Sequence, residues 1–212
     1  MGNINVVIIR SNPINPDPRT ENEAAVLGKN GYNVTMLGWN RKRDCVSFED
    51  KEYYKISRIS LKAPIGIGVI ILWPIWWLLA AIWLLRNDWD IVHAADFDCY
   101  PPAYIVSKIK HKKVIYDLID HYPDMLPLPH FIHSVFTHTN RSFINSADGI
   151  LLIDSCKIEQ VGGLRSDVTI IYNTPPSIYS DLKKTDDDRN KFKIFYGGMI
   201  FYDRGITNLL RL

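Results

Sequence analysis

The sequence is poor in cysteine and lacks the glycine motifs that bind nucleotides after a first strand. Its three cysteines, Cys45, Cys99 and Cys156, are scattered and form no CxxC pair. A disulfide framework and a zinc ribbon are therefore not expected, and reduced thiols in a cytosolic compartment are the simplest account. No GxGxxG follows the first apolar run, and GxxxxGKS or GxxxxGKT occurs nowhere. This absence excludes the dinucleotide fingerprint and the P-loop.

The chain also has little net charge and no signal-peptide pattern at its start. A formal net charge of +2 over 212 residues gives no reason to expect nucleic acid or another polyanion as a partner. The opening letters, MGNINVVIIR, lack a basic leader and run directly into a strand pattern. No metal site is expected, because the histidines after residue 120 match no zinc spacing; they are His121, His130, His133 and His138.

One long apolar run stands out from an otherwise ordinary sequence. Pro64–Leu85 contains no charged side chain and holds four of the six tryptophans. As a helix its 22 residues would reach about 33 Å, enough to cross a bilayer core of about 30 Å. Basic residues approach the run from Lys51 to Lys62, and Arg86 closes it. These flanking basic residues fit an anionic membrane surface. The alternative is that they keep an aggregation-prone apolar segment soluble.

The rest of the chain has the alternating strand and helix pattern of a soluble α/β protein. Short β-branched runs alternate with helical patterns, beginning with a strand, a capped helix, a glycine and a second strand within the first 40 residues. This order predicts a Rossmann-like, doubly wound parallel sheet. The expected strands are 4–10, 33–39, 53–61, 91–94, 113–117, 149–153 and 168–172, and the expected helices are 20–30, 101–110, 129–146 and 155–160. Asn40–Asp50 is expected to be a loop, and Thr20 with Glu23 a capping box.

The amino-acid composition changes after Asn173, and this change sets the expected domain boundaries. Residues 174–190 contain two prolines, three consecutive aspartates and few apolar side chains, so they are interpreted as a linker. Residues 191–212 resemble one strand and the start of one helix. We therefore expect a complete domain over residues 1–173, a linker, and the first strand–helix unit of an incomplete second domain.

Six short motifs in order resemble the GT-B glycosyltransferases, specifically the family-4 (group 1) type. They lie at Asp17–Ala24, Asp90–Asp96, Val114–Pro123, Ala147–Ile150, Tyr172–Pro175 and Tyr196–Gly205. The resemblance implies two facing Rossmann-like domains, of which the N-terminal one holds the acceptor and the C-terminal one binds a nucleotide-diphosphate sugar. The implied reaction transfers a glycosyl group to an acceptor hydroxyl without an obligatory metal or other cofactor.

Ligands of a doubly wound sheet bind at the carboxyl ends of its strands, so the loops after the first, fourth and fifth strands are the places to search. In these loops we interpret His93, Asp96 and Asp120 as candidate catalytic residues. Asp17, Arg19 and Asp117 are candidate substrate-binding residues. The alternatives are a satisfied histidine at a strand end, turn-forming aspartates and helix caps, and a salt bridge between Asp17 and Arg19 that holds the first loop.

The resemblance places a diphosphate-contacting residue at Arg204, beside Gly197, which permits close backbone approach. A guanidinium binds phosphate oxygens through two parallel hydrogen bonds, and an exposed surface arginine is the alternative. The chain departs from the family pattern at three positions. Gly198 stands where some relatives carry an arginine, and Ala95 and Ile119 stand where the pattern has histidines.

The E-x7-E motif of the resembled family is absent from these 212 residues. We therefore expect a fragment or half-enzyme, inactive alone and active when joined to a matching C-terminal domain. A non-catalytic, membrane-associated adaptor or a subunit of a split transferase is the alternative. A dehydrogenase-like domain is disfavoured by the missing glycine fingerprint.

Three placements of the apolar run remain open at this stage: an interfacial or re-entrant helix, a buried domain helix, and a true span. A span would separate strands that the predicted sheet joins, and Pro74 disfavours one straight helix. An interfacial helix would contact lipid through Trp73, Trp76, Trp77 and Trp83. The expected partners are a nucleotide sugar, a lipid-linked or glycan acceptor and the membrane surface, with a cytoplasmic, peripheral location. Changing Trp76 and Trp77 to glutamate is expected to release a folded protein from membranes.

Overall fold

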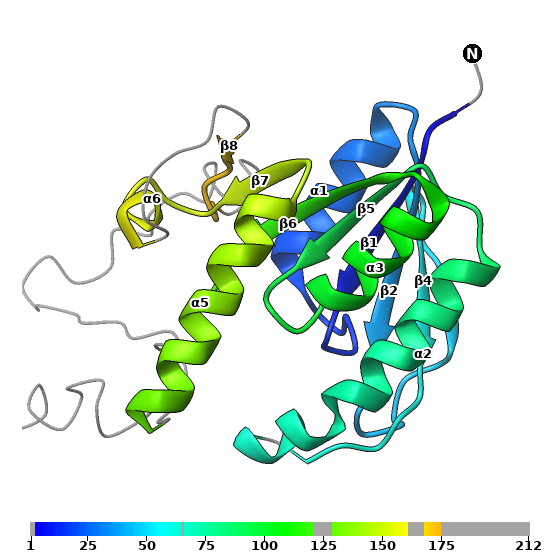
Figure 1. The fold of residues 1–212 in the computed structure, drawn as a ribbon. Coiled ribbons are helices and arrows are strands. Elements are labelled where there is room, and N and C mark those ends of the chain that lie inside the picture. Colours follow the sequence, from blue (N-terminus) through cyan, green and yellow to red (C-terminus); the bar gives the residue numbers. More distant parts are fainter. Residues whose placement is uncertain (1–2, 65, 121–128, 161–167, 175–212) are drawn as a thin grey trace, which may run out of the picture. The chain divides into compact units, whose positions relative to one another are not determined.

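The structure, a computed structural model, describes residues 3–64, 66–120, 129–160 and 168–174 (Figure 1). Residues Met1–Asn173 belong to one structural unit. Apart from Thr174, the linker and the second domain expected after residue 173 lie outside the described residues, as do the predicted phosphate-binding residues Gly197 and Arg204.

Eight strands form one sheet in the order β3-β4-β2-β1-β5-β6-β7-β8. All neighbours pair in parallel except β3 (Phe48–Asp50), which runs antiparallel to β4. The parallel strands are β1 (Asn5–Arg10), β2 (Asn33–Trp39), β4 (Tyr54–Ile59), β5 (Ile91–Ala95), β6 (Lys113–Leu118), β7 (Gly149–Leu152) and β8 (Val168–Ile170). The predicted Rossmann-like fold class is confirmed. The interpretation of residues 40–50 as a loop is wrong in part, because the last three pair with β4.

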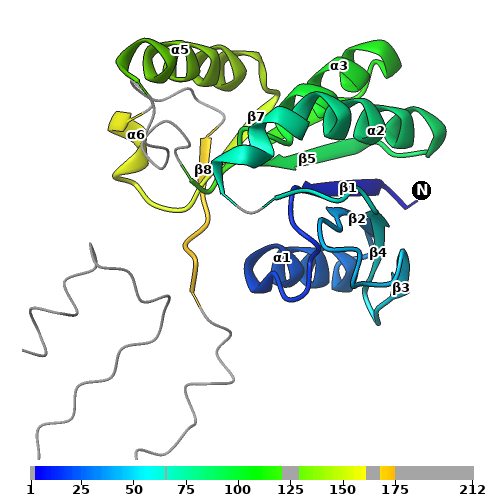
Figure 2. The same cartoon turned by 90° about the horizontal axis from the view of Figure 1, so that it is seen from below.

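The helices cover the two faces of the sheet unequally (Figure 2). One face carries α1 (Pro18–Lys29), and the other carries α2 (Trp73–Arg86), α3 (Tyr100–Lys110) and α5 (His130–Ser146). A short 3-10 helix, η1 (Ile67–Leu72), leads directly into α2, and α6 (Lys157–Gln160) follows β7. Because parallel strands share direction, the loops after β1, β5 and β6 meet at one edge of the sheet, called the carboxyl edge here.

The first helix begins earlier than its sequence pattern suggested. Pro18 occupies the first turn, where a missing N–H costs nothing. The backbone N–H of Asp17 donates to Glu21 Oε1 at 2.6 Å. The predicted capping box at Thr20 and Glu23 is therefore wrong, since both residues lie inside the helix. This shift leaves Glu23 available for other contacts.

The apolar run forms η1 and α2, which connect β4 to β5 within one sheet. By length and hydropathy alone, Gly68–Arg86 could cross a membrane, with a mean hydropathy of 2.2. Here Trp76, Ala80 and Leu84 are fully buried against the sheet. Because the strands before and after α2 pair within the same sheet, α2 is a crossover helix in this fold rather than a span.

Two of the four tryptophans assigned to membrane contact, Trp73 and Trp76, are buried in the protein, which corrects the assignment for those two. Trp73 is 3% exposed, and Trp76 is 0% exposed and stacks on Trp39 with ring centroids 5.1 Å apart. Trp77 and Trp83 are half-buried, and their indole N–H groups donate to Asp98 O at 2.8 Å and Ser57 Oγ at 3.1 Å, respectively. These indoles complete the core because large aromatic side chains gain most by burial with a partnered N–H.

Helix α5 has the expected length but a different buried face. Ile144 is buried, while Phe136 and Phe143 pack partly buried against the main core. Phe131 and Val135, which the apolar pattern of residues 129–146 would place in the core, are instead 77% and 47% exposed. The first turns of α5 therefore present apolar side chains outward.

Candidate functional site

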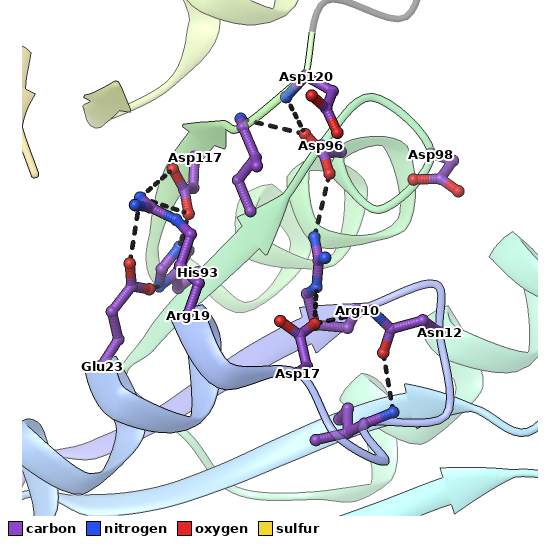
Figure 3. A network of polar contacts seen from close by, with 12 residues as sticks. Arg10, Asn12, Asp17, Arg19, Glu23, His93, Asp96, Asp98, Asp117 and Asp120 are labelled. Atoms are coloured by element: carbon purple, nitrogen blue, oxygen red, sulfur yellow. Dashed lines mark hydrogen bonds and ion pairs between the residues drawn. The ribbon is translucent and has the colours of Figure 1, made fainter. Parts of the chain in front are cut away.

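Two networks of buried charges lie at and beside the carboxyl edge, one around Arg10 and one around Arg19 (Figure 3). Arg10 is the last residue of β1, and Arg19 lies in the first turn of α1. The Arg10 network therefore involves the loop between β1 and α1, and the Arg19 network involves α1 itself. Partners on the far side of each network come from β5, β6 and the residue after β5.

Arg10 joins the first loop to the end of β5. Its Nε lies 2.5 Å from Asp17 Oδ2, and its Nη1 lies 3.0 Å from Asp96 Oδ2. Asn12 Nδ2 also donates to Asp17 Oδ2 at 2.7 Å. Burial raises the pKa of Asp17, but the charge of Arg10 and the bond from Asn12 outweigh it and leave this pKa below its ordinary value. The pair holds the loop in place as an ionised bridge.

Asp96 binds the backbone of the first two residues after β6. Its Oδ1 accepts the backbone N–H groups of Ile119 at 3.1 Å and Asp120 at 2.8 Å. The Asp96 backbone has a φ of 70°, a left-handed conformation that aspartate tolerates better than most residues. Burial raises the pKa of Asp96 to about 7, against the opposing charge of Arg10. Near neutral pH this buried carboxyl group can therefore gain or lose a proton.

Arg19 connects α1 to β6 and to the chain after β8. Its Nη2 lies 3.1 Å from both Asp117 Oδ1 and Glu23 Oε1. Its Nη1 donates to the carbonyl oxygen of Ile171 at 3.0 Å. His93 completes the cluster, with Nε2 3.2 Å from Asp117 Oδ2 and Nδ1 3.9 Å from Glu23 Oε2. Four side chains from three elements thus share one buried site.

The pKa values of the two acids in this cluster, Glu23 and Asp117, are shifted in opposite directions. Burial raises the pKa of Glu23, and the neighbouring charge of Asp117 raises it further. Burial also acts to raise the pKa of Asp117, but the hydrogen bond and charge of His93, with Arg19, leave it below its ordinary value. Asp117 is therefore the ionised partner on which Arg19 and His93 converge.

Glu23, His93 and Asp117 are also the one group of potential metal ligands within the described residues, with ligand atoms within 4.8 Å of one another. The guanidinium of Arg19 lies among them, 3.1 Å from two of the three. A divalent cation here would have to displace that positive charge. The chemistry of this cluster favours an internal ion-pair network over a metal centre.

The structure separates the predicted catalytic residues into different environments. His93 and Asp96 are 4% and 5% exposed and belong to different networks. Asp120 is exposed, and its backbone N–H is fixed by Asp96. Asp17, Arg19 and Asp117 are buried and paired internally. For Asp17 the geometry matches the salt-bridge alternative, with Arg10 rather than Arg19 as the partner.

Sequence reasoning missed Arg10, Asn12 and Glu23. Arg10 had a usable signal, because it is the single charge at the end of an apolar strand. Glu23 lies four residues after Arg19, the spacing of a helical ion pair. The capping-box interpretation turns Glu23 toward the start of the helix, whereas in the structure it lies beside His93 and Arg19.

One surface hollow lies away from both networks. It measures about 490 Å³ and is lined by residues at the amino edge of the sheet, including Asn5, Asn33, Lys51 and Tyr53. The networks are packed side-chain clusters, and Asp120, beside the Arg10 network, is exposed.

Comparisons with known proteins identify the fold. No protein-family profile and no curated protein sequence matches the chain. Among solved structures, a shortened form of sucrose-phosphate synthase from Thermosynechococcus elongatus superposes with a TM-score of 0.60 at 10% identity, covering 79% of this chain and 88% of that chain. The chain has the fold of one half of a GT-B enzyme.

Two further similar structures show how widely this fold is used. MurG from Acinetobacter baumannii matches with a TM-score of 0.51 at 13% identity, over 86% of this chain and 50% of MurG. A putative UDP-N-acetylglucosamine 2-epimerase from Listeria monocytogenes matches with a TM-score of 0.51 at 11% identity, over 79% and 44%. The chain spans about half the length of MurG and of the longer sucrose-phosphate synthase. The fold is glycosyltransferase-like, and a fold shared by several reactions does not by itself specify which one a protein catalyses.

Proposed function

We propose that this chain supplies the acceptor-binding half of a family-4-type glycosyltransferase that uses a nucleotide-diphosphate sugar. The fold of one GT-B half supports the proposal, together with the six ordered motifs of the sequence. The observation that carries it furthest is the exposed Asp120 at the carboxyl edge, where Asp96 binds the backbone N–H groups of Ile119 and Asp120. This edge is where a doubly wound sheet places its ligands.

Asp120 is the residue proposed to contact the acceptor hydroxyl. A carboxylate at this point can orient the hydroxyl and accept its proton as the glycosidic bond forms. The Asp96 carboxylate holds the backbone of residues 119 and 120 by two hydrogen bonds. Asp96 is therefore a positioning residue, and Arg10 fixes Asp96 in turn. His93 and Arg19 act one layer deeper, by holding the end of β6 through Asp117.

The donor side of the reaction is proposed from the resemblance. Arg204 and Gly197 are candidates for contact with the diphosphate of the nucleotide sugar, because a guanidinium neutralises phosphate charge as the leaving group departs. Turnover is proposed to require a complete nucleotide-sugar domain. A cytoplasmic, membrane-peripheral location and a lipid-linked or membrane-proximal acceptor complete the proposal.

A second candidate function is a non-catalytic, membrane-associated adaptor. The observation that favours it is the internal pairing of His93, Asp96 and Asp117, which are all buried. Such networks can stabilise a scaffold without any chemistry. The two candidates differ in whether sugar is transferred.

A donor screen tests the proposed function. Membranes from cells that express the protein joined to a matching, complete C-terminal nucleotide-sugar domain are incubated with radiolabelled UDP-glucose, UDP-N-acetylglucosamine, UDP-galactose or GDP-mannose. Label that enters the organic-solvent extract in proportion to the protein supports transfer to a lipid-linked acceptor. Label in a water-soluble glycan supports transfer and contradicts the lipid acceptor. If no donor labels either fraction while the protein is folded, the adaptor is favoured.

A further inference from the structure

The outer face of η1 and α2 carries exposed apolar side chains up to Arg86, the basic residue that ends the helix. Ile71 is 80% exposed and Leu78 60%, and Ile75 and Leu85 are each 45% exposed. With Pro74, these residues recur at helical spacing on the side opposite Trp76, Ala80 and Leu84. A helix that covers a sheet normally carries polar residues on this side. The outer face therefore lacks the polar surface that solvent exposure favours.

The start of α5 extends this apolar surface. Phe131 is 77% exposed, and Ile132 and Val135 are also exposed. The two helices meet beneath this surface, because the ring of Phe136 lies 6.0 Å from that of Trp73. Both helices begin at the same edge of the sheet, the lower edge in Figure 1. The exposed apolar residues of α2 and α5 thus concentrate at the carboxyl edge.

Basic side chains flank this apolar surface. Lys62 is exposed just before the run, and Lys42 and Arg43 are exposed in the loop after β2. The backbone N–H of Ala63 donates to the carbonyl oxygen of Arg41 at 3.2 Å, which places that loop beside the start of the run. Asp44 is the one exposed acid in residues 41–44 and 62–64. Apolar side chains beside an excess of positive charge suit an anionic lipid surface.

We infer that the outer face of η1 and α2, with the first turns of α5, docks into the interface of an anionic bilayer. The residues that enter the lipid are Ile71, Ile75, Leu78 and Phe131, and the tryptophans form the support beneath them. A second copy of this chain is a poorer occupant. A two-fold contact through this face would bring the basic flanks of both copies together.

Docking at this surface would act directly on the candidate site. Trp77 Nε1 donates to the carbonyl oxygen of Asp98 at 2.8 Å, two residues after Asp96. The membrane-facing helix is thereby tied to the loop that positions Asp120. This orientation rests on the proposed function, whereas the docking itself does not. A lipid-linked acceptor would reach the carboxyl edge from the membrane it is embedded in.

A matched pair of substitutions tests the docking surface. Leu78→Glu is compared with Val26→Glu, since Val26 is 59% exposed on α1, across the sheet. Purified full chain is floated with vesicles of phosphatidylcholine alone, or of phosphatidylcholine mixed with phosphatidylglycerol. We expect the wild type and Val26→Glu to bind the anionic vesicles. We expect Leu78→Glu to bind about ten-fold more weakly, with an unchanged melting temperature.

Three outcomes would overturn the inference. The first is a wild-type chain that floats with neither vesicle. The second is equal binding by Leu78→Glu and Val26→Glu. The third is a wild type that is dimeric by light scattering and becomes monomeric with Leu78→Glu, which would assign the surface to a second copy. Equal binding to both vesicle compositions would overturn the role of Lys42, Arg43 and Lys62. Because vesicle flotation requires no sugar transfer, its failure is distinguishable from failure of the proposed function.

Discussion

Arg19 Nη2 lies 3.1 Å from Asp117 Oδ1, and this buried ion pair joins α1 to β6 across 98 residues of sequence. Arg19 is 9% exposed and Asp117 0%. The pair stabilises the sheet only while both charges are present. Either residue alone would leave a buried charge without its main counter-ion.

The first prediction concerns this pair. Asp117→Leu should lower the free energy of unfolding by about 3–5 kcal/mol, because Arg19 and His93 would both lose their ionised partner. Urea denaturation measures the change. Lys113→Met is the control, because the Lys113–Asp148 pair involves a lysine side chain that is 71% exposed. Its effect should stay within about 1 kcal/mol.

The double variant Arg19→Met with Asp117→Leu sharpens this test. Since both charges are removed together, it should be more stable than Asp117→Leu alone. If the two changes simply add, the ion pair does not couple these elements and this account of the cluster is wrong.

The second prediction concerns the stacked tryptophans of α2. Trp76→Ala should cost about 3–5 kcal/mol of unfolding free energy, because Trp76 is fully buried and stacks on Trp39. Leu78→Ala, two residues away on the exposed side, should change it by less than about 1 kcal/mol. Equal stabilities for the two variants would show that α2 does not pack as described. The same burial predicts that Trp76→Glu unfolds the protein rather than releasing it folded from membranes.

The third prediction is a pH dependence assigned to Asp96. Its pKa of about 7 in the folded state exceeds its ordinary value of 3.8 because burial disfavours the charged form. The folded state therefore binds this proton more tightly, and the stabilisation, complete below pH 3.8, is lost as the pH rises through 7. Asp17 and Asp117 have lowered pKa values in the folded state, so their contribution to the stability of the fold is lost only as the pH falls below their ordinary pKa.

Asp96→Asn isolates this contribution. Asparagine keeps an oxygen acceptor for the N–H groups of Ile119 and Asp120 and tolerates the φ of 70°. The fall in melting temperature between about pH 4 and pH 7 should therefore be shallower in this variant than in the wild type. Identical pH profiles would show that Asp96 does not titrate in this window.

The fourth prediction concerns the close approach of α1 to the chain before β4. A Cβ added at Gly28 would lie 2.0 Å from the carbonyl oxygen of Tyr53, so Gly28→Ala forces backbone to move. We expect a loss of about 1–3 kcal/mol. Gly149→Ala is the matched control, because its nearest neighbour would be an ordinary contact at 3.8 Å. Chemical denaturation of both variants compares them, and a neutral Gly28→Ala would contradict the packing of α1.

The parallel sheet could be predicted from sequence because its strands are runs of β-branched and apolar residues bounded by turns. Strand β3 could not, since Phe48–Asp50 is too short and too polar to show a pattern. The loops that carry the site were also predictable, because a doubly wound sheet fixes which strand ends meet. The pairing within them was not, since it depends on how α1 is rotated. The position of Glu23 followed only once the helix was seen to begin at Pro18.

The apolar run Pro64–Leu85 also could be predicted only in part from the sequence. Its composition correctly indicated a helix that needs apolar surroundings, but hydropathy does not distinguish protein from lipid as the surround. The stacking partner of Trp76 is Trp39, 37 residues earlier in the sequence, and that contact decides which side faces inward. The tryptophans were assigned to lipid because of their general preference for interfaces. In the fold they fill the core, and the aliphatic residues between them face outward.

The most direct test of the proposed function compares Asp120→Asn with Asp50→Asn in the sugar-transfer assay. Both aspartates are exposed, but Asp120 lies at the carboxyl edge and Asp50 at the end of β3. With the donor identified by the screen, Asp120→Asn should reduce the rate of transfer by at least about 100-fold, because it loses the proton acceptor. Asp50→Asn should transfer sugar at the wild-type rate. Equal rates for the two variants would contradict the assignment of the acceptor site to this edge of the sheet.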